Sequence, residues 1–424
     1  MSKGKLKLRD TRALNADATG GITPLKSTVL NKKVASTEIL NRRSKTKSKL
    51  NYDVVVCGGG VTGLMIASKL STLGIKCALV ERGKFLADGP STRNEGWLHR
   101  GTYHAYSIKD RARAMRVAKR CIYGHEQVRQ FAPEALEDLE SNSYAVTTDN
   151  TNIDELISRW KEADVQFKEI QVRSLTAANP SLKFENFANA FLVGDVAINT
   201  RILYRKLLVS AKLNKTTIYV ESELASIDGD IATLFQSGDR IQIRSKLFIH
   251  ATGYRISSGF GKLFGKSLPV RFWKSHLLVT GRFSADSVFF VDPNEAAAIH
   301  HGKKSITGMN EDATLVAQPD FYVTEQSRFK ILTAASRLFR FDFSQPHEVV
   351  ACIKVDFAEN EAATRSLDIS ISEPIDNHLC VLPGKMTEAP YVSDRVAALV
   401  YNRLGDQSIA LRPMDRLVNG SLVT

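Results

Sequence analysis

The sequence predicts an α/β fold in which a discontinuous Rossmann-like nucleotide-binding domain is combined with a second, α+β domain that contains a mixed or antiparallel sheet. Three observations lead to this prediction. Between Tyr52 and Glu81 a strand, a glycine-rich turn, a helix and a second strand follow one another. A strand followed by a turn recurs at 247–254 and again at 379–400. From about 268 to 372, short strand signals dominate instead.

The first unit begins with the apolar, β-branched run YDVVVC, which is followed by three consecutive glycines. Leu64, Ala67 and Leu70 then recur at the three-residue spacing of a helix with one buried face. The run IKCALVER predicts a second strand that ends at Glu81. We therefore expect one βαβ unit, the building block of a parallel nucleotide-binding sheet.

Three further segments are predicted to be helical. Residues 107–131 read as one long helix, and Ser107 with Asp110 resembles a capping box at its start. Residues 154–163 also read as a helix, and 199–213 have an amphipathic pattern.

Nucleotide-type units at the start, in the middle and near the end imply that the first domain is built from separate stretches of chain. The expected boundaries are 52–106, 195–262 and 375–405 for the nucleotide-binding domain, and 107–194 and 263–374 for the substrate domain. We assign 1–51 to a basic, flexible N-terminal tail and 406–424 to a C-terminal tail.

Most of the net charge of +13 lies in the N-terminal tail. Residues 1–51 hold thirteen lysines and arginines against three acids, and they contain no aromatic side chain. This composition predicts a mobile basic arm. Because its arginines are not interleaved with aromatic residues, we expect no nucleic-acid partner.

The remaining composition is that of an ordinary globular chain. No run of eighteen apolar residues predicts a transmembrane helix, and no secretory signal is evident. The five cysteines are scattered without metal-binding spacing, so we expect no metal site and reduced thiols in a cytoplasmic compartment. Organelle targeting by the basic tail is the alternative.

The turn after the first strand matches the pattern G-x-G-x-x-G over residues 58–63. In such a turn the first glycine makes the bend, the second admits a pyrophosphate, and the third lets the helix pack closely. Glu81 would accept hydrogen bonds from a ribose diol. The residues expected to bind a dinucleotide here are Gly58, Gly60, Val61, Thr62, Gly63, Glu81 and Arg82.

A polar and aromatic segment, STRNEGWLHRGTYH, follows at 91–104. It resembles the D-amino-acid oxidase superfamily, and most closely the L-2-hydroxyglutarate dehydrogenase group, with a related segment in flavin-type glycerol-3-phosphate dehydrogenases. The matching positions are Asn94, Gly96, Leu98, His99, Gly101 and Tyr103.

Two later segments strengthen the resemblance. The strands before Ala251-Thr252-Gly253 and before Pro383-Gly384-Lys385 resemble the second and third flavin-contact segments of glutathione-reductase-like flavoproteins. The final turn, PGKMTEAP, departs from the hydroxyglutarate pattern and is nearer the glycerol-phosphate type. Trp97 and Arg100 also depart, because smaller residues are expected at those positions.

The resemblance implies FAD as the cofactor. It also implies that the final turn aims a helix N-terminus at the flavin, which would stabilise the reduced form. The further cofactor contacts that it implies are Asn94, Gly96, Leu98, Glu223, Leu224, Thr252, Gly253, Gly384, Lys385, Met386 and Thr387.

The resemblance also implies catalytic roles for two residues. His99 would be the general base, with two alternatives: a histidine that only hydrogen-bonds flavin or backbone, or a covalent flavin link. Arg365 would clamp a carboxylate or phosphate, its alternative being a surface arginine. The expected substrate contacts are Tyr103, His104, His301 and Asn310, although HHGKK at 300–304 could equally be a solvated loop.

The function implied is an FAD-dependent oxidoreductase. It would oxidise a CH–OH group of a small anionic substrate, a 2-hydroxyacid or a phosphorylated polyol, by hydride transfer to flavin N5. The main alternative is an amine or amino-acid oxidase of the same superfamily. Lesser alternatives are a flavin monooxygenase and an FAD-bound binding protein without catalysis. The sequence leaves the electron acceptor and the oligomeric state open.

Overall fold

The computed structural model describes residues 50–404, apart from 138, 140, 310–312, 341, 343 and 359–364. The two predicted tails therefore lie almost wholly outside the described residues. One boundary needs correction, because Leu50 and Asn51, assigned to the N-terminal tail, are the first residues of strand β1 (Leu50–Cys57). They pair with Ile243 and Arg244 of a neighbouring strand, which extends the sheet beyond the apolar run.

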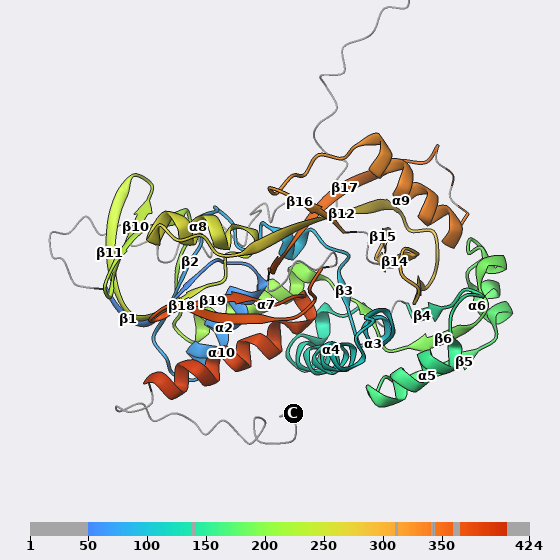
Figure 1. Ribbon diagram of the computed structural model, residues 1–424, viewed down its shortest axis with the longest axis horizontal. Helices are drawn as coiled ribbons and strands as arrows, with labels where there is room; N and C mark the ends of the chain where they lie inside the picture. The colour runs from blue at the N-terminus through green and yellow to red at the C-terminus, as the bar shows by residue number, and fades with distance from the viewer. Residues whose placement is uncertain are drawn as a thin grey trace, which may run out of the picture. The chain divides into compact units, whose positions relative to one another are not determined.

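Within the described residues, the predicted βαβ unit lies in a sheet of eight strands whose order is β18-β19-β11-β1-β2-β8, with β10 and β9 continuing from β11 as an antiparallel ribbon. β11 runs parallel to both β1 and β19, so strands from the start, the middle and the end of the chain lie side by side (Figure 1). Besides β1, the strands are β2 (Cys77–Val80), β8 (Thr217–Tyr219), β9 (Ser222–Asp228), β10 (Ile231–Gln236), β11 (Asp239–His250), β18 (Ser370–Ile375) and β19 (His378–Leu382).

Both faces of this sheet are covered. Helix α2 (Val61–Thr72) contacts α7 (Thr200–Leu213) and α10 (Ala389–Leu404) on one face. Successive residues of β1 alternate between two cores: Val54 and Val56 pack with these helices, whereas Val55 and Cys57 pack with β10 and β11. Burial on both faces explains why the first strand is apolar at consecutive positions.

A second sheet, with nine strands in the part of the chain that the structure describes, has the order β16-β12-β15-β14-β13-β4-β6-β5, with β17 paired to β12. It is antiparallel except where β13 runs parallel to β4, which confirms the predicted mixed sheet and α/β fold. The predicted domain boundaries stay a prediction. Its strands are β4 (Ser143–Val146), β5 (Phe167–Ile170), β6 (Ala190–Val193), β12 (Val270–Gly281), β13 (Ser287–Phe290), β14 (Ala296–His301), β15 (Lys304–Met309), β16 (Thr314–Val316) and β17 (His347–Phe357).

The long helix predicted over 107–131 is α4 (Arg111–Phe131), which begins four residues later than expected; Ser107 is the last residue of a separate short helix, α3 (Thr102–Ser107). The expected capping box is also wrong, because Ser107 ends α3. Asp110 alone caps α4, and its carboxylate accepts a hydrogen bond of 2.6 Å from the Arg113 backbone N–H. Ile108 is buried between the two helices, and its extended backbone turns the chain there.

Helices α3 and α4 contact one another and pack against elements that adjoin the two different sheets. Helix α4 contacts α10 and the short η5 turn (Met386–Glu388), whereas α3 contacts α5 (Ile153–Glu162). The remaining elements are β3 (Trp97–Leu98), β7 (Val196–Ala197), α6 (Val172–Ala178), α8 (Ile256–Phe264), α9 (Glu325–Leu338), η1 (Pro90–Thr92), η2 (Pro133–Ala135), η3 (Phe184–Asn186) and η4 (Gly253–Arg255).

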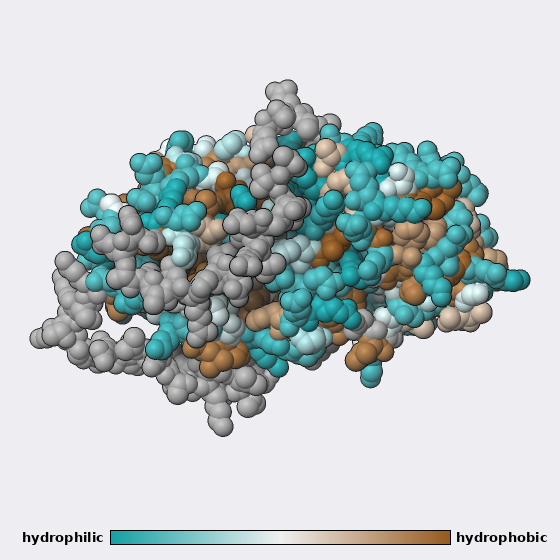
Figure 2. Space-filling model, turned by 90° about the horizontal axis from the view of Figure 1, so that it is seen from below, coloured by the Kyte–Doolittle hydropathy of each residue, from teal (hydrophilic) through white to brown (hydrophobic). Residues whose placement is uncertain are grey.

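Hydrophilic residues predominate on the face seen in Figure 2, with smaller apolar patches between them. Among the described residues, none of the helices combines the length and the apolar character that a membrane span requires.

Gly124 in the middle of α4 offers a test of the close approach between this helix and the η5 turn. A Cβ at Gly124 would lie 1.7 Å from the Thr387 carbonyl oxygen. We expect Gly124→Ala to lower the free energy of unfolding by about 2 kcal/mol or more, as measured by urea denaturation.

Gly259 in α8 provides the matched control, because a Cβ there meets no atom within 4 Å. Gly259→Ala should leave stability unchanged or raise it by up to about 1 kcal/mol. Equal urea midpoints for Gly124→Ala and the unaltered protein would contradict the packing described.

Candidate active site

The glycine-rich turn forms one end of the site. Gly58 has a φ of +106°, and a Cβ on Gly63 would lie 1.9 Å from the Gly58 carbonyl oxygen, so α2 packs directly against the end of β1. Gly60 is the N-cap residue of α2 and supplies no capping side chain. The backbone N–H groups that begin α2 therefore adjoin the cavity, an arrangement suited to an anion. One of them, Val61 N–H, donates to Ser91 Oγ at 3.0 Å.

Glu81 lies beside the same turn, at the end of β2. Its Oε2 accepts from Gly59 N–H at 2.7 Å, and its Oε1 accepts from Gly83 N–H at 2.6 Å. Two backbone donors thus hold the carboxylate in the cavity wall.

A single cavity of about 900 Å³ runs from this turn to the polar segment predicted to lie beside the flavin. This volume is at the upper end of the range for ligand pockets. The predicted site residues that line the cavity are Gly58, Gly60, Val61, Thr62, Glu81, Arg82, Asn94, His99, Tyr103, His104, Thr252, Gly253, Arg365, Gly384, Lys385, Met386 and Thr387.

Some predicted residues lie elsewhere. Gly63, Gly96 and Leu98 are not in the cavity wall, and Asn310 is outside the described residues. Glu223 and Leu224, predicted as cofactor contacts, begin strand β9 away from the cavity. Glu223 is paired with Lys262 at 2.7 Å, and Leu224 packs against the core beneath the ribbon.

His301, predicted to bind substrate, does not line the cavity and instead contacts the backbone of the segment 91–104 at Glu95. Its Nε2 is 2.7 Å from the Glu95 carbonyl oxygen, and its Nδ1 is 2.9 Å from Glu137 Oε2. The HHGKK segment forms the turn of the β14–β15 hairpin, in which Gly302 and Lys303 are exposed, as expected of a solvated loop, whereas His300 is buried. We infer that His301 supports the loop that carries His99.

His99 lies at the cavity wall, where its ring contacts Trp97 and meets His104 edge to face, with centroid distances of 4.2 and 4.5 Å. Its Nδ1 is 3.7 Å from Asp195 Oδ1. Burial lowers the pKa of His99, and Asp195 opposes this effect. The imidazole is therefore uncharged at neutral pH and able to accept a proton.

Asp195 is a functional candidate that the sequence did not single out. Its side chain is fully buried and accepts hydrogen bonds from Arg100 N–H, at 2.9 Å, and from the Thr102 hydroxyl. The sequence pattern that could have indicated it is an acidic residue between a glycine and the apolar run VAI. Only the fold shows that this acid lies beside His99.

Arg365 and Lys385 are two cations that lie close to one another in the cavity wall. Arg365 Nη2 donates to the Gly384 carbonyl oxygen at 3.0 Å, while its Nε has no hydrogen-bond partner among the described residues. Burial lowers the pKa values of Arg365 and Lys385. Lys354 lines the same cavity and lies 3.7 Å from the carboxylate of Glu95, an anion in the same wall. This grouping of cations suits an anionic ligand.

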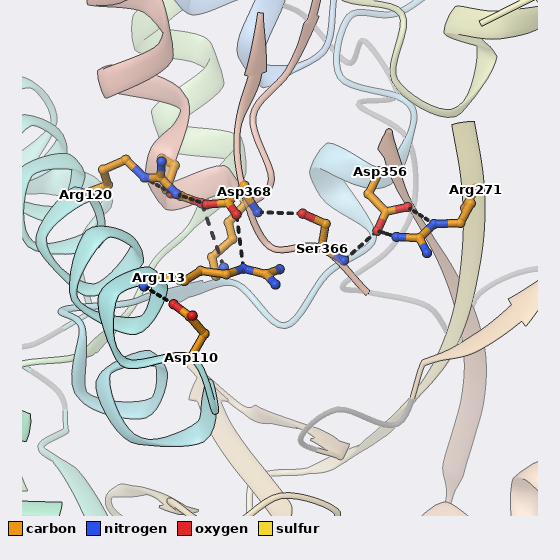
Figure 3. A network of polar contacts seen from close by, with 9 residues as sticks. Asp110, Arg113, Arg120, Arg271, Asp356, Ser366 and Asp368 are labelled. Atoms are coloured by element: carbon orange, nitrogen blue, oxygen red, sulfur yellow. Dashed lines mark hydrogen bonds and ion pairs between the residues drawn. The ribbon is translucent and has the colours of Figure 1, made fainter. Parts of the chain in front are cut away.

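The segment around Arg365 is fixed on both sides by acids (Figure 3). Ser366 N–H donates to Asp356 Oδ2 at 2.6 Å, and the same carboxylate pairs with Arg271 at 2.9 Å. Asp368 pairs with Arg113 and Arg120 of α4, at 3.1 and 2.9 Å. These contacts hold the cation at the cavity and were not predicted from sequence.

Residues 53–356 match the family described as DAO, FAD dependent oxidoreductase. The chain is 25% identical over 181 residues to one subunit of the anaerobic glycerol-3-phosphate dehydrogenase of Haemophilus influenzae, covering 42% of this chain and 31% of that protein. It is 25% identical over 220 residues to a glycerol 3-phosphate oxidase of Mycoplasma pneumoniae, covering 48% of this chain and 54% of the relative. The chain thus spans about a third to a half of the length of these curated relatives.

Solved structures resemble the fold over most of the chain. The dithionite-reduced L-α-glycerophosphate oxidase of Mycoplasma pneumoniae with FAD bound has a TM-score of 0.68 at 17% identity, covering 86% of this chain and 97% of its own. Glycine oxidase from Geobacillus kaustophilus has a TM-score of 0.64 at 18% identity, with the same coverages. At these identities the likeness concerns the fold alone.

Asp195→Asn tests whether Asp195 supports the charged form of His99. The amide keeps an acceptor for Arg100 N–H but removes the negative charge, so we expect the pKa of His99 to fall by roughly 1 unit or more. Histidine NMR titration of the FAD-loaded protein measures this shift, with His347, which begins β17 outside the cavity wall, as the internal control. An unchanged His99 titration would contradict the coupling.

Proposed function

The chain belongs to the family of FAD-dependent oxidoreductases, and from this premise we propose that it binds FAD and oxidises a CH–OH group of a phosphorylated polyol, such as a glycerol phosphate. The observation that carries the proposal is the single cavity that joins the dinucleotide turn to His99, Arg365 and Lys385.

The residues that line the cavity at the glycine turn and at the turn before α10 fit FAD. The glycine turn and the N-terminus of α2 suit its pyrophosphate, and Glu81, held by two backbone N–H groups, suits the adenosine ribose. The turn from Gly384 to Thr387 precedes α10 and also lines the cavity. FAD, when bound, accepts the hydride that leaves the substrate carbon.

His99 is proposed to remove the proton from the substrate hydroxyl. An uncharged imidazole is a suitable base near neutral pH, and Asp195 would stabilise the imidazolium that forms. The ring contacts with Trp97 and His104 restrict its orientation. The backbone of His99 is fixed by a bond of 3.2 Å from its N–H to Thr387 Oγ1.

Arg365 and Lys385 are proposed to hold the anionic group of the substrate. Arg365 Nε and Lys385 Nζ both lack a hydrogen-bond partner among the described residues, so each has a donor left for a ligand. A phosphate is favoured over a carboxylate because the curated relatives are named for glycerol 3-phosphate, and because the turn PGKMTEAP resembles the glycerol-phosphate type.

Anaerobic reduction of the FAD-loaded protein tests the substrate class. Flavin absorbance should bleach with sn-glycerol 3-phosphate, and much more slowly with glycerol, 2-hydroxyglutarate or glycine. Bleaching by amino acids alone would replace this proposal with amino-acid oxidation, and absence of bleaching by any phosphorylated polyol would also overturn it.

A matched pair of variants tests the anion clamp in the same assay. Arg365→Gln should weaken binding of the phosphorylated substrate roughly 10- to 100-fold, since a hydrogen bond to a charged group contributes about 1.5–3 kcal/mol. Arg395 is exposed on α10, outside the cavity, and Arg395→Gln is the control. Equal substrate affinity in both variants would remove Arg365 from the clamp.

A further inference from the structure

Glu388 is a buried carboxylate that the proposed reaction does not use. It ends the η5 turn, and its side chain is fully shielded from solvent. Its Oε1 accepts a hydrogen bond of 2.7 Å from Arg120 Nε. Its Oε2 has no hydrogen-bond partner among the described residues, although Lys385 Nζ lies 3.8 Å away. Burial raises the pKa of Glu388, and the charges of Lys385 and Arg120 oppose this effect.

Lys385 is the cation that faces this free oxygen. Its side chain is 9% exposed and lines the cavity, and among the described residues Nζ makes no hydrogen bond. A lysine ammonium that is removed from water loses its proton readily unless an anion is nearby. The charge of Lys385 therefore depends on its neighbours.

Those neighbours come from several elements, and among the groups with the largest effects on the Lys385 pKa only Glu388 is an anion. Cys121 has its pKa raised by burial and stays an uncharged thiol at neutral pH. The cations Arg365 and Arg120 oppose a further positive charge, and His99 and His104 are uncharged. The titratable groups that interact with Lys385 are Glu388 on its own turn, Arg120 and Cys121 on α4, Arg365, and His99 with His104.

The position of Glu388 is set by contacts with other elements. Arg120 of α4 binds Oε1 and also binds Asp368 at 2.9 Å, which joins the η5 turn to the segment that carries Arg365. Within the turn, Glu388 N–H donates to the Lys385 carbonyl oxygen at 3.2 Å. Glu388 therefore keeps one oxygen fixed on Arg120 and leaves the other directed to Lys385.

We propose that Glu388 is a positioning residue that keeps the Lys385 ammonium protonated and aimed into the cavity, where it meets the anionic group of the substrate. The proposal rests on the proposed function and deepens it. Arg120 keeps Glu388 ionised from one side, so that the carboxylate supports the Lys385 charge from the other. The positive charge of Lys385 thus depends on two further residues, Glu388 at the end of η5 and Arg120 on α4.

The effect of pH has a definite sign. Burial lowers the pKa of Lys385, and Glu388 raises it again. Anion binding through Lys385 should be lost as the pH rises through the Lys385 pKa. Without the carboxylate that pKa falls further, so the loss should begin at a lower pH.

The first experiment measures Lys385 directly in the FAD-loaded protein. NMR titration of ε-¹³C-lysine, with the resonance assigned by its absence in Lys385→Met, should show the pKa falling by roughly 1 unit or more in Glu388→Gln. Glu388→Asp keeps the negative charge, so the Lys385 pKa in this variant should stay close to its value in the unaltered protein. Asp230→Asn, which removes the exposed ion pair of 2.6 Å between Asp230 and Arg244 outside the cavity, is the control and should have no effect.

The second experiment uses sulfate as the probe, because its charge is constant over the pH range used. At pH 8 to 9, Glu388→Gln should raise the sulfate dissociation constant roughly tenfold or more. In a Lys385→Met background, the same substitution should add nothing.

An unchanged Lys385 titration in Glu388→Gln would overturn the proposal, as would an equal loss of sulfate affinity in both backgrounds. These readouts do not use turnover. A protein that fails to oxidise phosphorylated polyols but shows the Lys385 shift would therefore refute the proposed substrate and leave the role of Glu388 standing.

Discussion

Keeping positive charge in a buried cavity is the constraint on which this site depends. Arg365 and Lys385 both line the cavity, and burial lowers the pKa of each. Water cannot stabilise these charges fully, so carboxylates must do so. Asp356 and Asp368 hold the segment that contains Arg365, and the Glu388 carboxylate lies 3.8 Å from the Lys385 ammonium. The acids are themselves held by arginines: Asp356 pairs with Arg271, and Asp368 pairs with Arg113 and Arg120 (Figure 3).

This network also explains how the two sheets come to share one site. Arg113 and Arg120 lie on α4, Asp368 precedes β18 of the first sheet, and Asp356 lies on β17 of the second. A change in the docking of α4 would therefore disturb both cations. The close approach of Gly124 to the η5 turn places that helix near enough for the pairing.

Local sequence patterns predicted the parts of the site that are local in the chain. The βαβ unit, its glycine turn and the His99 segment are each contained within a few tens of residues, and the structure places them at one cavity. Partners that are far apart in the sequence were missed, because no local pattern indicates that they meet. Glu388 pairs with Arg120, and Asp195 approaches His99, although many residues separate each pair in the chain. His301 was misjudged because the hairpin that turns it towards Glu137 is a tertiary feature.

The central claim is that the cavity binds FAD and that Arg365 and Lys385 together hold the anionic group of the substrate. A crystal structure of the FAD complex with sn-glycerol 3-phosphate tests it most directly. The account predicts the FAD pyrophosphate at the N-terminus of α2 and the substrate phosphate within hydrogen-bond distance of Arg365 and Lys385. A substrate phosphate bound away from both cations would contradict the account.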